Sequence, residues 1–279
     1  MNVHTPSDPS LHQLAPGDHV CWIVDDLAAA LVDAGTIEAA GARHRQRTLV
    51  LGPCDSELRN SLAEQASAAA DPWTDFLAAE RFEPDVMYRT FRQQTALALA
   101  DGYDGLRLVA DMDWLLPARL PTSQIVGFEL LLDSVVQELG ATVVCAYRRA
   151  SFDDHALGAM TCVHPINVGV DADPQFQLVA ADFGTWRLTG EVDLAVTDVF
   201  AHAIRSAVGS GACRLDVSQL GFIDVAGTRA LAHAASSSGQ PVAVVGRCAT
   251  LERCWKLAEL ASIAPLVTFE PLLPDVRGN

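Results

Sequence analysis

Short apolar segments alternate with longer segments of helical periodicity in the first part of the chain. The short segments are HVCWIV (19–24), RTLVLGP (47–53), LRLVADM (106–112) and ATVVCAY (141–147). Before the last of these, apolar residues recur at helical spacing, at Ile125, Phe128, Leu132, Val135 and Leu139. Strands that are apolar throughout are typical of parallel sheets that helices cover on both faces. The pattern therefore predicts an α/β domain with a mostly parallel sheet and helices on both faces.

Boundary signals mark the ends of two of the expected helices. Ser56 stands directly before ELRNSLAEQ (57–65), which has the composition of a helix, and its hydroxyl can cap the first turn. Pro84 stands near the start of a later helix, and Gly102 follows its end. We expect helices to begin near Ser56 and near Pro84, and the second of them to end before Gly102.

The pattern changes near NVGVDADPQ (167–175), which has Gly, Asp and Pro but no periodic apolar face. Such a segment is typical of a linker. Two adjacent strand-like segments follow, FQLVAADF (176–183) and TWRLTGEV (185–192), as in a hairpin. The remaining elements are helices around 197–208, from Val225 and around 250–260, and strands at 213–220, 241–246 and 266–270. The order ββαβαβαβ predicts a second domain over residues 175–272.

Composition and charge narrow the classes of function. The chain has 279 residues, of which 50% are hydrophobic, and this is enough for two cores. Its net charge of −16 repels phosphate backbones and anionic membranes, so we expect no nucleic-acid or membrane binding. The opening MNVHTPSDPS is not typical of a signal peptide, and no apolar run approaches the roughly 18–20 residues that span a bilayer. We expect a cytoplasmic protein.

His19 and Cys21 form the first candidate site. They stand two residues apart on an expected strand, so their side chains project to the same face. An imidazole beside a thiol suits metal binding, nucleophilic chemistry, or sensing of an electrophile or oxidant. The pair Cys162-x-His164 mirrors it, and the four residues together would make a Cys2His2 metal site. This alternative requires that the two distant segments be neighbours in the fold.

An enzyme is the other alternative, with Cys21 as nucleophile and His19 or His164 as base. No Cys–His–Asn/Asp family signature occurs in the sequence, so we expect no catalytic residues. The turn LGPCDSELRN lacks the GK[ST] of a phosphate-binding loop, which argues against an ATPase. The seven cysteines contain no CxxC pair, and most are expected to be small buried hydrophobic residues.

Five motifs occur in the order typical of one sensory family. They are GDHVCWIVDD (17–26), LRLVADMDWLL (106–116), GFELLLDS (127–134), VVCAYRRASFD (143–153) and CVHP (162–165). In this order they resemble the MEDS domain, a sensory module named for methanogens, methylotrophs and a dichloromethane-responsive regulator. The resemblance covers residues 10–166 and implies a RecA-like fold and a small-molecule ligand, whose identity and any cofactor stay unknown.

The residues that the resemblance assigns to a ligand pocket are His19, Cys21, Asp111, Trp114, Glu129, Cys145, Tyr147 and His164. At Asp111 the resemblance leads us to expect glutamate, and the shorter side chain alters its reach. Trp114 and Tyr147 also fit as core aromatics, Cys145 as buried packing, and His164 as a loop-closing residue. We expect His19, Cys21, Trp114 and Glu129 to line one mostly apolar pocket.

The second half resembles a STAS domain of the anti-sigma-factor-antagonist type. The motifs are LTGEVDLA (188–195), LDVSQLGFIDVAGTRAL (215–231) and VAVVGRCATLERCWKL (242–257). The resemblance implies an anti-sigma factor or a related kinase-like regulator as partner. It also implies a phosphorylated serine directly before the glycine of FIDVAG. Here that position is Ala226, and a methyl group cannot accept a phosphoryl group.

The expected switch and partner-binding residues of this second domain are Asp224, Val225, Ala226, Gly227 and Thr228. Asp224 fits best as the N-cap of the following helix. Thr228 carries a hydroxyl but lies within the first turn of that helix, so it is a weak substitute acceptor. The whole sequence is interpreted as a signalling protein in which a sensory domain controls a STAS domain that lacks its phosphoacceptor. A larger assembly of copies of this chain is the alternative.

Overall fold

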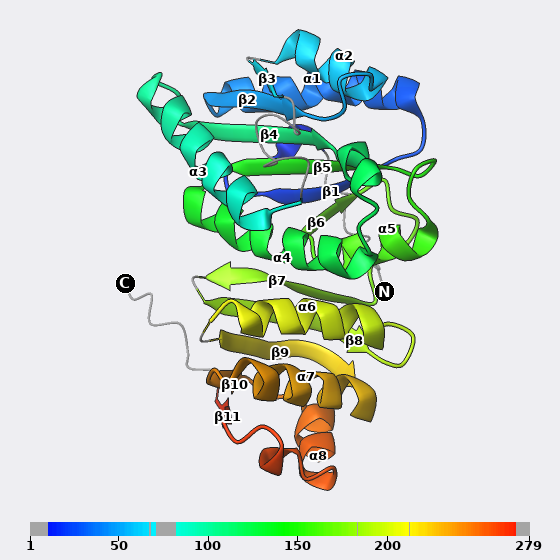
Figure 1. The fold of residues 1–279 in the computed structure, drawn as a ribbon, viewed down its shortest axis with the longest axis vertical. Coiled ribbons are helices and arrows are strands. Elements are labelled where there is room, and N and C mark those ends of the chain that lie inside the picture. The colour runs from blue at the N-terminus through cyan, green and yellow to red at the C-terminus, as the bar shows by residue number, and fades with distance from the viewer. Residues whose placement is uncertain (1–10, 67, 71–81, 183, 212, 272–279) are drawn as a thin grey trace, which may run out of the picture. The chain divides into compact units, whose positions relative to one another are not determined.

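The computed structural model describes residues 11–66, 68–70, 82–182, 184–211 and 213–271. The chain divides into two compact units, and each is built on one β-sheet with helices packed against it (Figure 1). Both are α/β, as predicted. Within the described part of the chain, no helix is long and apolar enough to cross a membrane.

The first sheet has six strands in the order β3-β2-β4-β5-β1-β6, and all neighbouring strands in it are parallel. The strands are β1 (His19–Val24), β2 (Gln46–Leu51), β3 (Ala68–Ala70), β4 (Gly105–Asp111), β5 (Thr142–Arg148) and β6 (Ile166–Val168). Every residue of β1 and β4 is buried, which explains why these strands lack a polar alternation. The prediction of a mostly parallel sheet is confirmed.

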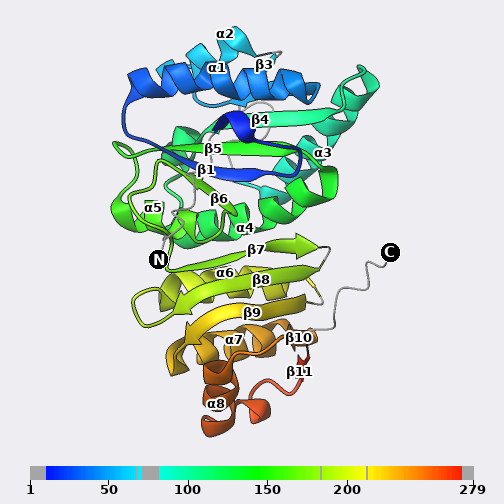
Figure 2. The same cartoon turned by 180° about the vertical axis from the view of Figure 1, so that it is seen from behind.

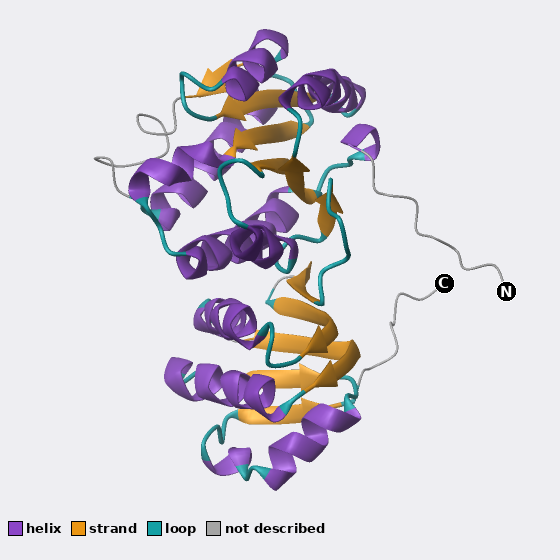
Figure 3. Cartoon of the chain, turned by 90° about the vertical axis from the view of Figure 1, so that its right-hand side faces the viewer, coloured by secondary structure: helices purple, strands orange, loops and turns teal. Residues whose placement is uncertain are grey.

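Helices lie on both faces of this sheet (Figure 3). They are α1 (Leu27–Arg43), α2 (Glu57–Gln65), α3 (Pro84–Ala100), α4 (Thr122–Leu139) and α5 (Asp154–Thr161), with 3-10 helices η1 (Leu11–Gln13) and η4 (Met112–Ala118). The expected boundary signals are confirmed, because Ser56 accepts a hydrogen bond from the backbone of Arg59 and α3 begins at Pro84. Gly102, just beyond α3, adopts a φ of +88° that favours glycine.

The two faces of the first sheet differ in character. One face packs against α1 and α2 and is apolar at its centre. Its residues are Val20, Trp22, Val24, Val50, Val109, Val144 and Ala146, with Ala30 and Ile37 of α1 and Leu58 and Leu62 of α2. Side chains alternate along a strand, so His19, Cys21 and Cys145 project from the other face. That is the face on which α3 and α4 lie (Figures 1 and 2).

The second sheet has five strands in the order β11-β10-β9-β8-β7. They are β7 (Phe176–Asp182), β8 (Thr185–Val192), β9 (Cys213–Ile223), β10 (Val242–Val245) and β11 (Val267–Glu270). Strands β7 and β8 form the expected antiparallel hairpin, and the other neighbours are parallel. The sheet is therefore mixed, and the predicted order ββαβαβαβ is confirmed.

The helices of the second unit are α6 (Thr197–Gly209), α7 (Val225–Ser238) and α8 (Ala249–Leu257), with the 3-10 helix η5 (Leu260–Ser262). Helices α6 and α7 lie side by side on one face of the sheet (Figure 2). The helix expected around 250–260 ends early, because Glu259 adopts a left-handed conformation and separates α8 from η5.

Candidate metal centre

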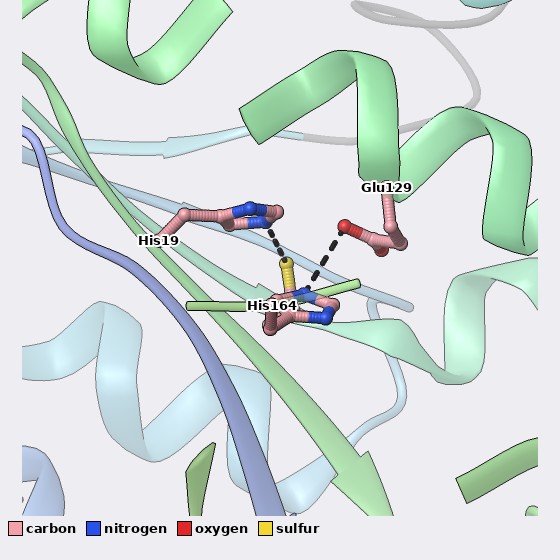
Figure 4. Close-up of side chains that lie close together, drawn as sticks. His19, Glu129 and His164 are labelled. Carbon is pink, nitrogen blue, oxygen red and sulfur yellow. Dashed lines mark hydrogen bonds and ion pairs between the residues drawn. The ribbon is translucent and has the colours of Figure 1, made fainter. Parts of the chain in front are cut away.

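Four buried side chains bring their ligand atoms within 4.8 Å of one another, and they belong to His19, Glu129, Cys145 and His164 (Figure 4). His19 is the first residue of β1, and Cys145 lies in β5. Glu129 belongs to α4, and His164 lies between α5 and β6. Each of these residues is at most 1% exposed. Elements far apart in the sequence thus place nitrogen, sulfur and oxygen donors around one buried point.

The pairing of β1 with β5 sets the position of His19 relative to Cys145. His19 is the register partner of Val143, which precedes Cys145 by two residues and projects to the same face. The two side chains are therefore diagonal neighbours on parallel strands. His19 Nε2 lies 3.7 Å from Cys145 Sγ.

The ring of His164 is held in one orientation by the backbone. Its Nδ1 lies 2.8 Å from the carbonyl oxygen of Met160, and a carbonyl can only accept, so Nδ1–H is the donor. In the neutral ring, Nε2 then carries a lone pair, and it lies 3.4 Å from Glu129 Oε2. A lone pair facing a carboxylate oxygen requires a proton or a cation between them. This part of the group is therefore suited to a positive charge.

The donor set is that of a site for a borderline divalent ion. Two imidazole nitrogens, one thiolate and one carboxylate oxygen are all ligands that zinc accepts in tetrahedral sites. With zinc bonds of about 2.0–2.3 Å, ligand atoms lie about 3.3–3.8 Å apart. The distances of 3.4 Å between His164 and Glu129 and 3.7 Å between His19 and Cys145 fall in that range. The Met160 carbonyl would orient His164 in the way that second-shell acceptors orient metal-bound histidines.

The predicted Cys2His2 set is not the set that the structure brings together. His19 and His164 are both in the group, but Glu129 and Cys145 take the places expected for Cys21 and Cys162. The thiol of Cys162 donates to the carbonyl of Gly158 at 3.3 Å. Burial raises the pKa of Cys162 to about 12, so it stays a neutral thiol. Cys21 projects to the same face as Cys145 and is its direct register partner.

Asp111 lies apart from this group. Its register partner on β5 is Ala146, a member of the apolar cluster, so its side chain projects toward α2 rather than toward Cys145. Its carboxylate accepts hydrogen bonds from the Ser56 hydroxyl and from the backbone of Asp113. Burial raises the pKa of Asp111, partly offset by the bond from Ser56.

The aromatic residues predicted for the pocket are buried among other rings. Trp114 stacks on Phe82 with ring centroids 6.2 Å apart. Tyr147 makes an edge-to-face contact with Phe152 at 5.1 Å, and it projects from β5 on the same side as Cys145. Of the four residues expected to line one pocket, His19 and Glu129 are brought together. They belong to the group of His19, Glu129, Cys145 and His164, which is called the metal-ligating group below because it could hold a metal ion. A ligand-binding role for the other predicted residues stays a prediction.

The start of α7 is the second candidate site. Asp224 is its N-cap, as expected, because the carboxylate accepts from the backbone of Gly227 at 2.8 Å. A Cβ at Gly227 would lie 2.7 Å from Val192 Cγ1, which explains the glycine. Thr228 is fully buried, and its hydroxyl donates to the carbonyl of Asp224 at 2.7 Å. That hydroxyl is therefore poorly placed to accept a phosphoryl group.

The exposed part of this second site is a shallow surface hollow. Its lining residues are Asp224, Val225, Ala226, Arg229, Ala230 and His233. Val225 is 47% exposed, and Phe222 just before the helix is 38% exposed. Apolar side chains at the surface beside charged ones are typical of protein-binding faces.

Comparison with protein families gives two matches. The family described as the MEthanogen/methylotroph, DcmR Sensory domain (MEDS) matches residues 18–165, more than half of the chain. The family described as "Mlab, STAS domain" matches residues 182–268. Among curated proteins, no sequence matches the chain. The four candidate ligand residues all fall within the first match, and the start of α7 falls within the second. The exact domain boundaries, 10–166 and 175–272, stay a prediction.

Proposed function

The chain belongs to the MEDS family of sensory domains, and on that premise we propose that it is a metal-responsive signalling protein. In this proposal a divalent ion of the zinc class occupies the group of His19, Glu129, Cys145 and His164. Occupancy then controls what the STAS domain binds. The observation that carries the proposal is the convergence of four buried ligand atoms of three chemical kinds within 4.8 Å.

Sensing fits this group better than catalysis does. Four protein ligands complete a tetrahedral shell and leave no position for a substrate, whereas catalytic zinc sites keep one position for water or substrate. His19 Nε2 lies 3.7 Å from the thiol of Cys145, which the enzyme alternative does not use. The two families that match are a sensory domain and a STAS domain.

Metal binding is tested by equilibrium dialysis of chelator-treated full-length protein against zinc, with the bound metal measured by mass spectrometry. We expect one tightly bound ion per chain. Glu129→Gln and His164→Ala each remove one ligand and should weaken binding at least about 10–100-fold. Cys162→Ser is the matched control, since this buried thiol lies two residues from His164 but outside the group. Equal binding by wild type and both ligand variants would exclude the site.

For the STAS domain, we propose that the hollow at the start of α7 binds an anti-sigma factor or a related kinase-like regulator. What supports this is the STAS match, the exposed Val225 and Phe222, and the charged Asp224 and Arg229 beside them. With Ala226 at the expected acceptor position, binding is not released by phosphorylation there. In this proposal the sensory domain controls partner binding instead.

The missing acceptor is tested with a cognate anti-sigma kinase and ATP. We expect the wild type to stay unmodified over residues 220–230 and Ala226→Ser to gain a phosphate, because serine is nearly isosteric with alanine. The new phosphate adds about −1.5 to −2 charges at a helix N-terminus, which stabilises anions, but next to Asp224, which opposes it. We expect the phosphorylated variant to lose partner binding. Phosphate on Thr228 of the wild type would contradict the account.

A further inference from the structure

Cys21 and Cys145 are direct register partners on neighbouring parallel strands. Register partners project from the same face of a sheet, so both thiols lie on the side that carries the metal-ligating group. Cys21 is 0% exposed and Cys145 is 1% exposed. Neither cysteine forms a disulfide. A metal ligand thus has a second cysteine as its neighbour, and the proposed function does not use that cysteine.

The Cα spacing of paired strands lies within the range found for disulfides. Neighbouring strands lie about 4.7–4.9 Å apart. Cysteines joined by a disulfide have Cα atoms about 4.4–6.8 Å apart. The pairing of β1 with β5 therefore places the two cysteines at a Cα spacing that a disulfide can bridge.

We propose that Cys21 is the resolving thiol of a peroxide-sensitive switch, in which oxidation joins it to Cys145 and releases the metal ion. The inference rests on the proposed metal site, because it needs Cys145 to be a ligand. It assigns to Cys21 a role that metal binding alone leaves open. The domain would then respond to a small peroxide as well as to metal.

The chemistry balances in two steps. The Cys145 thiolate attacks one oxygen of the peroxide, the O–O bond breaks, and a sulfenic acid and a hydroxide ion form. Cys21 sulfur then attacks the sulfenic sulfur, and the departing oxygen leaves as water with the proton of the Cys21 thiol. Two electrons pass from the thiol pair to hydrogen peroxide, which ends as one water and one hydroxide. Sulfur bound in a disulfide is no longer an anionic ligand, so the ion dissociates.

Burial selects the oxidant. Side chains that are at most 1% exposed are out of reach of a bulky disulfide such as oxidised glutathione. Hydrogen peroxide is close to water in size, so a transient opening of the core admits it. The exposed Cys54 is open to any oxidant but is not part of the metal-ligating group.

The test uses zinc-loaded full-length protein treated with hydrogen peroxide. Released zinc is followed with a chromogenic chelator, and disulfides are mapped by peptide mass spectrometry after alkylation. We expect one zinc per chain to be released together with a Cys21–Cys145 disulfide. Thiol reductant should then restore zinc binding.

Two variants separate the role of Cys21 from general oxidation. Cys21→Ser should bind zinc as the wild type does, but its Cys145 should proceed to sulfinic acid, which thiol reductant does not reverse. Cys162→Ser should behave as the wild type. Reversible release by Cys21→Ser, or a disulfide that joins Cys145 to Cys162, overturns the inference. So does zinc that stays bound while peroxide oxidises other cysteines.

The same experiment distinguishes the two proposals. Reduced wild type that binds no zinc contradicts the proposed metal site, whatever peroxide does. Zinc that binds stoichiometrically but is not released through a Cys21–Cys145 disulfide supports the metal site and contradicts the switch.

Discussion

The two faces of the six-stranded sheet use the same strands for different purposes. Trp22 projects from β1 into the apolar cluster with α1 and α2, while its neighbour Cys21 projects toward the side of the metal-ligating group. Apolar burial stabilises the first face without any partner from outside the chain. On the second face, imidazole, thiol and carboxylate are buried together, and such groups are costly unless they are paired or bind a cation. One face should therefore set the stability of the fold, and the other should make stability depend on an ion.

The largest expected effect comes from the apolar face. Trp22→Ala removes a large buried side chain and should lower the free energy of unfolding by about 3–5 kcal/mol. Denaturant titration of metal-free protein measures this loss. The fraction that stays folded should still bind zinc with unchanged stoichiometry, since Trp22 projects away from the group. Loss of zinc binding without loss of stability would contradict the separate roles of the two faces of the sheet.

A comparable effect on the second face should appear only when zinc is present. Free zinc at about 1,000 times its Kd stabilises the folded state by about 4 kcal/mol, and chelator removes this contribution. His164→Ala should show no difference between zinc and chelator, whereas Cys162→Ser should shift as the wild type does. Thermal unfolding with and without zinc measures both. A zinc-dependent shift that survives in His164→Ala would place the ion elsewhere.

The smallest effect is expected at Asp111, the acidic side chain on the face of α1 and α2. Burial raises the pKa of Asp111 in the folded state. The stability that depends on its proton is therefore full below the unfolded pKa of about 3.9 and is lost as the pH rises through the higher folded value. Asp111→Asn does not titrate and can still bond to Ser56 and Asp113.

Relative to wild type, Asp111→Asn should thus gain stability from about pH 4 upward, with differences within about 1 kcal/mol. Denaturation at several pH values tests the sign. Zinc affinity should not change, because this carboxylate is outside the metal-ligating group. A loss of zinc affinity would show that Asp111 contributes to the site and would support the ligand pocket predicted from the sequence.

Much of the fold could be predicted from the sequence, and the exceptions have local causes. Mostly apolar runs marked β1, β2, β4 and β5, because both of their faces are covered. The three alanines of β3 carry no strand signal, and β6 is three residues long at the start of the expected linker. Such short edge strands depend on neighbours rather than on their own composition.

The site could be predicted only in part. The spacing of His19 and Cys21 showed that their side chains share one face of a strand. The same spacing between Cys162 and His164 suggested that the two pairs form one metal site. Spacing does not show which strand is the neighbour of β1, and the sheet order places β5, with Cys145, beside it. The tautomer of His164 is set by the carbonyl of Met160, a backbone atom that no side-chain pattern reports.

X-ray absorption spectroscopy of the zinc-loaded protein tests the central claim most directly. The account predicts four ligands at the zinc ion: one sulfur at about 2.3 Å and three nitrogen or oxygen atoms at about 2.0–2.2 Å. The sulfur should be absent in Cys145→Ser and present in Cys21→Ser and Cys162→Ser. Two sulfur ligands, or a spectrum that Cys145→Ser leaves unchanged, would contradict a centre made by His19, Glu129, Cys145 and His164.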